Sequence, residues 1–320
     1  MNVRFVTKKV AGSLLTVAFV LVFNFFLFRV VEADPVATLY RGRNLSAQQR
    51  AKLRHDFGVD QSTGAQFVKY LDQTAHFNLG ISYESRRPVK SEIADAFWPT
   101  VWLVGISTVL STVLGVLAGI YSGWRRGSKF DYAATSFTML TYAMPDFWLG
   151  LLILVAFGIT LGWFPIGGIH STGAHPGISG VIDYLRHMFL PCLTLTLAYL
   201  GEFSIVMRSS ILETLGEDYL LVARAKGLRD ALVRRRHAVP NALLPVVTLI
   251  AINFGFVLSG AIAVESVYSW PGLGRLTYTA INAPDLPLLQ GLFLLFSVSV
   301  IIANLGADLL YSSLDPRVRN

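Results

Sequence analysis

Chemically reactive side chains in this sequence are few, and most lie inside or beside long apolar stretches. Asp146 follows Pro145 within the stretch Tyr132 to Ile159. A carboxylate at that depth in a membrane is costly unless it is paired or hydrated, and Pro145 would kink the helix. Two interpretations of Asp146 stay open: a carboxylate that lines a solute path, or one at a helix kink that is tied to another span. Glu202 lies near Arg208 in sequence, which predicts an interfacial ion pair.

Motifs for phosphate binding, nucleophilic catalysis and metal binding are missing from the sequence. No string fits G-x-x-x-x-G-K-[ST], because the nearest one, from Gly123, has the wrong spacing. No G-x-S-x-G motif is present, which disfavours a membrane-embedded hydrolase. His170, His175 and His187 lack the tight spacing of metal ligands. We therefore expect no catalytic residue, no metal and no cofactor on this chain.

The composition indicates a polytopic membrane protein. The 320 residues are 53% hydrophobic and only 15% charged, and the mean hydropathy is +0.53. The formal net charge is +7, but the basic residues flank apolar segments, so nucleic acid is not an expected partner. The single cysteine, Cys192, lies in an apolar stretch and is interpreted as a small buried hydrophobic residue.

Six apolar stretches approach the length of about 20 residues that a transmembrane helix needs. The first is long for a signal peptide, which favours a retained span. Lys and Arg concentrate in segments 1–9, 122–131, 208–242 and 312–320, whereas the short loops on the other side hold only Arg186 and Arg275, so both termini are expected in the cytoplasm. The predicted spans are Val10–Val31, Trp98–Tyr121, Tyr132–Ile159, Met188–Met207, Leu243–Val264 and Leu288–Tyr311.

An outer segment, residues 32–97, is expected to form a small helical cap after the first span. Ser46 with Gln49 reads as a capping box before Leu53 and Phe57, with Gly58 as a stop, and Thr63 with Gln66 repeats the pattern. Asn24 and Arg29 in the first span are interpreted as helix-packing or snorkelling groups. The predicted organisation is residues 1–31 as amino terminus and first span, 32–97 as the cap, 98–311 as a five-helix core with the loop 208–242, and 312–320 as a cytoplasmic tail.

The loop 208–242 contains a short helix with a signal at each end. Gly216 breaks the preceding helix, and Glu217 and Asp218 place acids at the next helix start, where the helix dipole favours them. Gly227 marks the end of this helix. Such a helix could be pushed by a soluble partner, and an ordinary solvated loop is the alternative.

The same loop resembles the "EAA" loop of binding-protein-dependent ABC importer permeases. Ala223 is followed at the family's spacing by Gly227 and by Ala238-Val239-Pro240, although Leu221-Val222 and His237 depart from the general motif. Residues 264–275 and 304–317 resemble signatures of the dipeptide/oligopeptide/nickel branch. Asp34-Pro35-Val36, residues 77–82 and Pro88-Val89 resemble its B-type subunit, so the resemblance covers essentially the whole chain.

The resemblance implies an all-α, six-helix permease of the type I importer fold, in the bacterial inner membrane. The implied partners are a second permease subunit in a heterodimer, two ATPases or one fused ATPase that bind ATP and Mg, an extracytoplasmic solute-binding protein and the lipid bilayer. The implied cargo is a di- or oligopeptide, a glutathione-like peptide or nickel, and the alternative is a stand-alone proton-coupled secondary transporter. The implied ATPase-coupling residues are Glu217, Asp218, Tyr219, Ala223, Arg224, Ala225, Lys226 and Gly227, and the expected path or gate residues are Pro145, Asp146, Trp148, Glu265, Pro271, Gly272 and Gly274.

Overall fold

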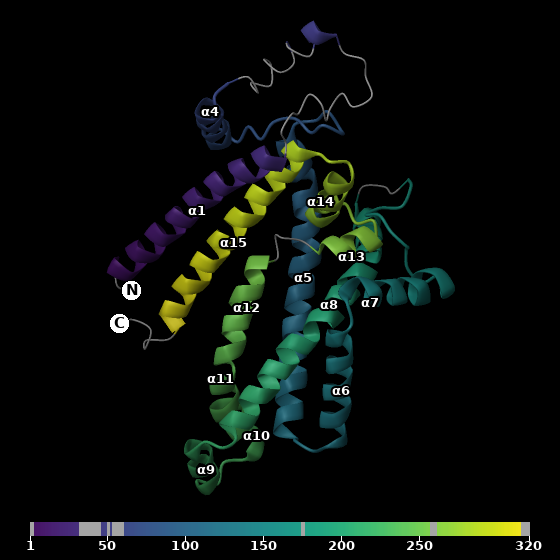
Figure 1. Cartoon of the computed structure of the whole chain (residues 1–320). Coiled ribbons are helices and arrows are strands. Elements are labelled where there is room, and N and C mark those ends of the chain that lie inside the picture. Colours follow the sequence, from purple (N-terminus) through teal and green to yellow (C-terminus); the bar gives the residue numbers. More distant parts are fainter. Residues whose placement is uncertain are drawn as a thin grey trace.

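The computed structural model describes residues 3–31, 46–49, 52, 61–173, 177–256 and 261–314, and its regular elements over these ranges are helices (Figure 1). The long helices are α1 (Val3–Val31), α5 (Val89–Trp124), α8 (Ile178–Thr214) and α15 (Leu286–Leu314). The shorter ones are α4 (Thr63–Ala75), α6 (Lys129–Ala143), α7 (Asp146–Ile153), η1 (Leu154–Thr160), α9 (Asp218–Ala225), α10 (Asp230–Val233), η2 (Arg234–Ala238), α11 (Val239–Ala242), α12 (Leu244–Phe256), α13 (Ile262–Val267) and α14 (Leu273–Asn282).

Helices α5 and α8 form the centre of the fold because small residues let their backbones approach closely. A Cβ atom added to Gly115 would lie 2.7 Å from the carbonyl oxygen of Leu200, and one added to Gly119 would lie 2.6 Å from that of Ser204. The two glycines are four residues apart and therefore share one helix face. Gly201 gives α8 an equally close approach to α6, where a Cβ would lie 2.5 Å from Thr138 O.

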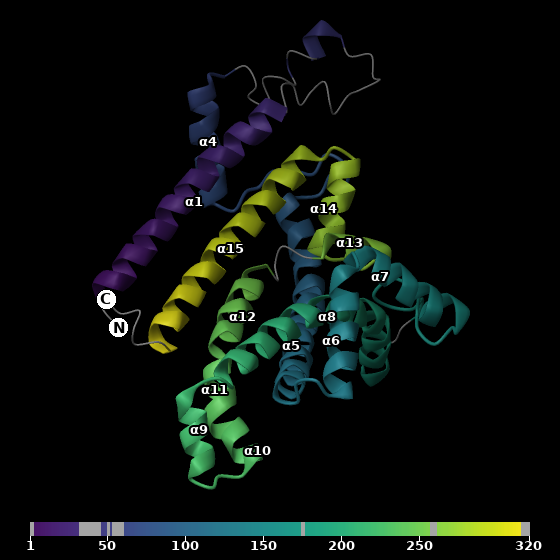
Figure 2. The same cartoon turned by 60° about the horizontal axis from the view of Figure 1, so that its bottom comes forward.

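Helices α1 and α15 lie side by side along one flank of this centre (Figures 1 and 2). An ion pair of 2.7 Å between Lys9 and Asp308 joins them. In both views α9 and α10 lie at one end of the molecule, called the α9 end below, and α4 lies at the opposite end, called the α4 end.

The predicted third span is not a continuous helix. Helix α6 ends at Ala143, Met144 is extended, and α7 begins at Asp146 with its axis turned by 106°. Pro145 has no backbone N–H, and it forces the preceding residue out of the helical conformation, which explains the break. Helix α7 consequently points sideways from the bundle (Figure 1). The kink that Pro145 predicted within Tyr132 to Ile159 is therefore present, as a sharp bend between two helices.

Within the described ranges, four helices are long and apolar enough to cross a membrane: residues 6–29 of α1, α5, α8, and residues 286–306 of α15. The bent pair of α6 with α7 and η1 counts as a fifth if it is one span. The predicted fifth span, Leu243–Val264, is divided in the structure between α12, which has 13 residues, and α13. Helix α5 begins at Val89, nine residues before the predicted boundary at Trp98.

The helix-start signals in the outer segment gave mixed results. The capping box is present, because Ser46 N donates to Gln49 Oε1 at 2.9 Å and Gln49 N donates to Ser46 Oγ at 3.2 Å. The second box was wrong by one residue: Ser62 caps α4 by accepting from the Ala65 N–H, and Gln66 donates instead to the carbonyl of Gln61. Leu53, Phe57 and the predicted stop at Gly58 lie outside the described residues.

Candidate coupling and gate sites

The end of helix α9 follows the backbone pattern that its sequence predicts. The N–H of Gly227 donates to Arg224 O at 2.9 Å, and the N–H of Leu228 donates to Ala223 O at 3.4 Å. This pair of bonds is the Schellman motif, which requires a left-handed residue. Gly227 supplies it with φ +76°, and a Cβ at this position would meet nothing within 4 Å. The backbone conformation, not a lack of space, therefore accounts for this glycine.

Helix α9 is fixed on one side and open on the other. Leu220 and Ala223 are only 1% and 5% exposed, and they join a cluster with Met207, Ile211 and other residues of the α9 end. The opposite face carries apolar side chains in the open, because Leu221 is 70% exposed and Val222 is 52% exposed. The remaining predicted coupling residues, Glu217, Asp218, Tyr219, Arg224, Ala225 and Lys226, are also exposed.

Trp124, the last residue of α5, connects that helix to the α9 region. Its indole N–H donates to Asp230 of α10 at 2.7 Å, and the guanidinium of Arg224 lies 5.8 Å from its ring centroid. The guanidinium of Arg234 lies 5.0 Å from the ring centroid of Tyr121, which is one turn earlier in α5. Both distances are within cation–π range. Helix α5 therefore contacts both α9 and α10 through the aromatic residues at its end.

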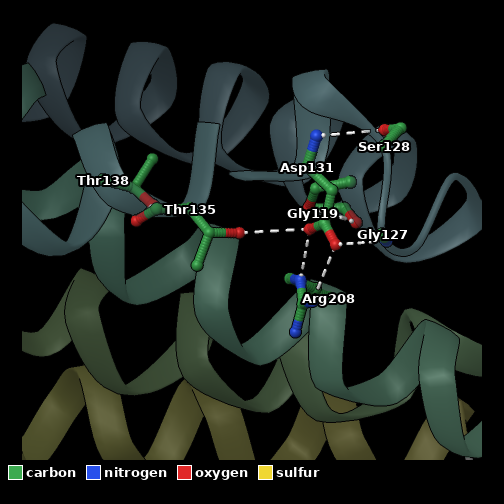
Figure 3. A network of polar contacts seen from close by, with 8 residues as sticks. Gly119, Gly127, Ser128, Asp131, Thr135, Thr138 and Arg208 are labelled. Carbon is green, nitrogen blue, oxygen red and sulfur yellow. Dashed lines mark hydrogen bonds and ion pairs between the residues drawn. The ribbon is translucent and has the colours of Figure 1, made fainter. Parts of the chain in front are cut away.

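An ion pair joins α6 to α8 near the α9 end (Figure 3). Arg208 donates to both carboxylate oxygens of Asp131, from Nε at 2.7 Å and from an Nη atom at 3.0 Å. Asp131 also accepts from Gly127 N and from the Thr135 hydroxyl, while Ser128 caps the helix by accepting from Asp131 N. Two parallel bonds fix the relative orientation of the two helices as well as their distance.

The predicted pair between Glu202 and Arg208 was wrong, because Asp131 takes the guanidinium. Glu202 instead lies opposite α12, where Asn253 Nδ2 donates to it at 3.5 Å. This contact joins a carboxylate of α8 to an amide of α12.

The predicted path residues of α7 lie at its beginning. Pro145 occupies the position before the helix, and Asp146 starts it, with its carboxylate accepting the Phe147 N–H at 2.7 Å. Asp146 is partly exposed, and Trp148 is half exposed. Asp146 therefore stands at the break between two helices, next to the proline that predicted a kink.

Glu265 is fully buried in α13 and organises the segment 265–275. One carboxylate oxygen accepts the Thr100 hydroxyl at 2.8 Å, and the other accepts the Arg275 N–H at 3.0 Å. The same Thr100 oxygen accepts the Leu273 N–H at 2.7 Å, and the Trp270 indole donates to Pro99 O at 3.0 Å. These contacts attach the segment to α5. Thr100 gave no signal in the sequence, because it lies 165 positions from its partner Glu265.

The glycines of this segment are required by close packing around the buried carboxylate. A Cβ on Gly272 would lie 2.4 Å from both Glu265 Oε2 and Thr100 Oγ1. One on Gly274 would lie 2.8 Å from the Ile262 backbone and 3.0 Å from Glu265 Oε2. The two glycines therefore make room for other atoms. Pro271 lines a pocket of about 310 Å³ beside them, together with Arg87 and Asp95.

Metal-ligating side chains do not gather within the described residues, where no group of three or more His, Cys, Asp or Glu could hold a metal ion. His170 and His187 flank Asp183 at 3.4 and 3.5 Å, and Ser171 donates to the same carboxylate. His175 lies outside the described residues.

Comparison with known proteins agrees with this architecture. Residues 115–320 match the family described as the binding-protein-dependent transport system inner membrane component, and residues 2–104 match the N-terminal family of the same membrane components. The chain therefore belongs to the permeases of binding-protein-dependent ABC importers, which are multi-pass inner-membrane proteins, and within them to the peptide/nickel branch.

Individual relatives cover the chain almost completely. It is 36% identical over 316 residues to the glutathione transport system permease protein GsiC of Escherichia coli strain K12 and to that of Salmonella typhi, with 99% of both chains covered in each case. Among solved structures, the MetNI methionine ABC transporter in an inward-facing conformation is similar in fold. The match has a TM-score of 0.56 and 15% sequence identity, and it covers 70% of this chain and 96% of that one.

Proposed function

We propose that this permease subunit forms half of a peptide path and is driven by separate ATPases through the segment Glu217 to Gly227. The observation that carries the proposal is the two-sided helix α9. Its buried face fixes it to the bundle, and its open face presents Leu221 and Val222, which a partner could cover. Exposed apolar side chains of this kind are typical of protein interfaces. ATP and Mg belong to the partner ATPases in this proposal.

The membrane placement follows from the same proposal. The basic residues of the α9 region face the cytoplasm, as the positive-inside rule predicts, and both termini lie on that side. Helix α4 and the pocket beside Pro271 then face outward, where a solute-binding protein delivers its cargo. Six crossings result if the bent pair and the α12 region each count as one. A second permease subunit, different in sequence, completes the path in a heterodimer.

The ATPase contact can be tested by placing a charge on the open face of α9. Leu221→Glu puts a carboxylate where the proposal requires an apolar contact, and it should abolish co-purification of the ATPases without reducing the amount of permease in the membrane. Arg235→Gln is the matched control, because it alters the net charge equally at an exposed position of the same loop. Full ATPase recovery with Leu221→Glu would refute the coupling role.

The cargo class is proposed from chemistry near the break in the third apolar stretch. Asp146 at the break and Glu202 on α8 carry carboxylates that suit the ammonium group of a peptide. The similarity to glutathione permeases supports a short peptide as cargo. Asp146→Asn should reduce the uptake of cationic peptides more than that of neutral ones. Equal reductions for both would make Asp146 a structural residue.

The segment 265–275 is proposed as part of the outer gate, since Glu265 ties it to α5. A stand-alone proton-coupled transporter is the weaker reading, because it gives no role to the open face of α9. Uptake into liposomes by the purified chain alone, without nucleotide or partner subunits, would favour that reading over the permease proposal.

A further inference from the structure

A second pocket is lined by residues of α1, α4, the segment 78–83 and the beginning of α15. Figure 1 shows α4 and the adjoining helix ends at the opposite end of the molecule from α9. Its volume is about 260 Å³, which is smaller than the pockets that usually hold drug-sized molecules. Polar side chains dominate the lining, and Arg29 is the single charged residue among the described residues that form it. Residues that contribute amide or hydroxyl groups include Asn24, Tyr70, Gln73, Asn78 and Gln290.

Asn24 leaves one buried acceptor in this pocket without a partner. Its side chain is 0% exposed, and its Nδ2 donates to the Tyr70 hydroxyl at 3.0 Å and to the Gln290 carbonyl at 3.3 Å. A carbonyl can only accept, so the amide orientation is determined, and Oδ1 is the atom left over. Within the described part of the chain Oδ1 has no hydrogen-bond partner. An unsatisfied buried acceptor costs about 1–3 kcal/mol, so a donor from a ligand is favoured here.

The surroundings of the pocket are those of a membrane interface. The side chains of Phe19, Phe23 and Phe26 on α1 are exposed, as lipid-facing residues of a membrane protein are. Helix α4 packs its aromatic side against the same level of α1, with Phe67 and Phe25 ring centroids 5.1 Å apart. Aromatic residues on a short helix beside the end of a span are typical of the headgroup region. Burial raises the pKa of Tyr70, so its hydroxyl keeps a proton that can be donated.

We propose that this pocket binds the headgroup of an outer-leaflet phospholipid. Arg29 would take the phosphate, because it is the only charge among the described lining residues, and a hydroxyl or ammonium group of the headgroup would donate to Asn24 Oδ1. Phosphatidylglycerol and phosphatidylethanolamine both carry such a donor. A bound lipid would then join α4 to α1 and α15. The inference rests on the membrane placement proposed above.

Retention of lipid by the assembled transporter tests the inference. The complex is reconstituted in vesicles of phosphatidylethanolamine and phosphatidylglycerol, extracted, and examined by native mass spectrometry. Wild type should keep a phospholipid on this subunit, and Arg29→Gln should lower its retention about tenfold or more through the lost charge-assisted bonds. Asn24→Ala should act in the same direction. Lys69→Gln is the matched control, since it removes one exposed positive charge from α4 outside the pocket lining.

Two results would overturn the inference. One is equal lipid retention by wild type and Arg29→Gln. This variant leaves Asn24 and its packing unchanged, so it separates loss of a ligand from loss of structure. The other is displacement of the retained lipid by soluble glycerol phosphate at low concentration, which would identify a free phosphate ester as the ligand. ATPase co-purification in the same preparations shows whether the coupling proposal holds, independently of the lipid count.

Discussion

The ion pair between Asp131 and Arg208 should contribute strongly to stability, and unequally from its two sides. The Asp131 side chain is 4% exposed and that of Arg208 is 28% exposed. Removing one partner of a buried pair costs about 3–5 kcal/mol, mainly because the other charge stays buried and uncompensated. Arg208→Gln leaves the more buried carboxylate with only Gly127 N and Thr135 as donors. Asp131→Asn leaves a guanidinium that water can reach.

We therefore expect Arg208→Gln to lower the free energy of unfolding by about 3–4 kcal/mol and Asp131→Asn by about 2–3 kcal/mol. The double variant should cost less than the sum, with a coupling free energy of about 1–3 kcal/mol. The assay is equilibrium unfolding of the purified chain in mixed micelles. The pair Lys9 and Asp308 is the control, because its side chains are 41% and 45% exposed and an exposed pair contributes only about 0–1 kcal/mol.

Three outcomes would refute this reasoning. If Asp131→Asn were the more damaging variant, burial of the carboxylate would not control the energetics. If the two single variants were additive, the bonds in Figure 3 would not act as a pair. A similar loss at Lys9 and Asp308 would show that exposure does not distinguish the two ion pairs.

Three further predictions concern glycines and the buried carboxylate. Gly272→Ala should destabilise the chain by about 1–3 kcal/mol through the contacts at 2.4 Å, whereas Gly105→Ala, which meets nothing within 4 Å, should stabilise α5 by up to about 1 kcal/mol in the same unfolding assay. Thr100→Val should cost about 2–3 kcal/mol, because Glu265 loses a donor and the Leu273 N–H loses an acceptor, and a milder loss would contradict these bonds. Gly227→Ala should cost about 1 kcal/mol and Gly227→Asn less, with ATPase co-purification weakened in the same order; equal behaviour would exclude φ as the cause.

The sequence predicted those features that depend on local patterns. The long apolar stretches predicted α1, α5, α8 and α15, and Gly227 predicted the end of α9, because its positive φ is a property of one residue. The helix ends were predicted less accurately, since α5 begins at Val89, before its apolar part starts at Trp98. Polar residues can extend a helix beyond the membrane without changing its periodicity.

Features that depend on tertiary contacts could not be predicted. Pro145 indicated a kink, but the bend of 106° also reflects where α7 packs: the Tyr268 hydroxyl donates to Gly150 O at 2.9 Å across 118 positions. Glu202 is nearer to Arg208 in sequence than Asp131 is, but the fold places the carboxylate of Asp131 at the Arg208 guanidinium. The sequence did not indicate a partner for the Glu265 carboxylate, because the partner, Thr100, is distant in sequence and close only in the fold.

Helix α5 links the two proposed functional ends of the chain. It has 36 residues, which corresponds to a length of about 54 Å. At one end Trp124 and Tyr121 contact the α9 region, and within the other half of the helix Pro99 and Thr100 hold the segment 265–275. The close contact of Gly115 with α8 fixes the middle. On the proposed function, a displacement of α9 would reach the outer gate through the part of α5 that follows Pro99, where no further proline interrupts the helix. The transport step then requires this part of α5 to move as a unit, which makes its aromatic contacts at one end and its threonine contact at the other parts of the same mechanism.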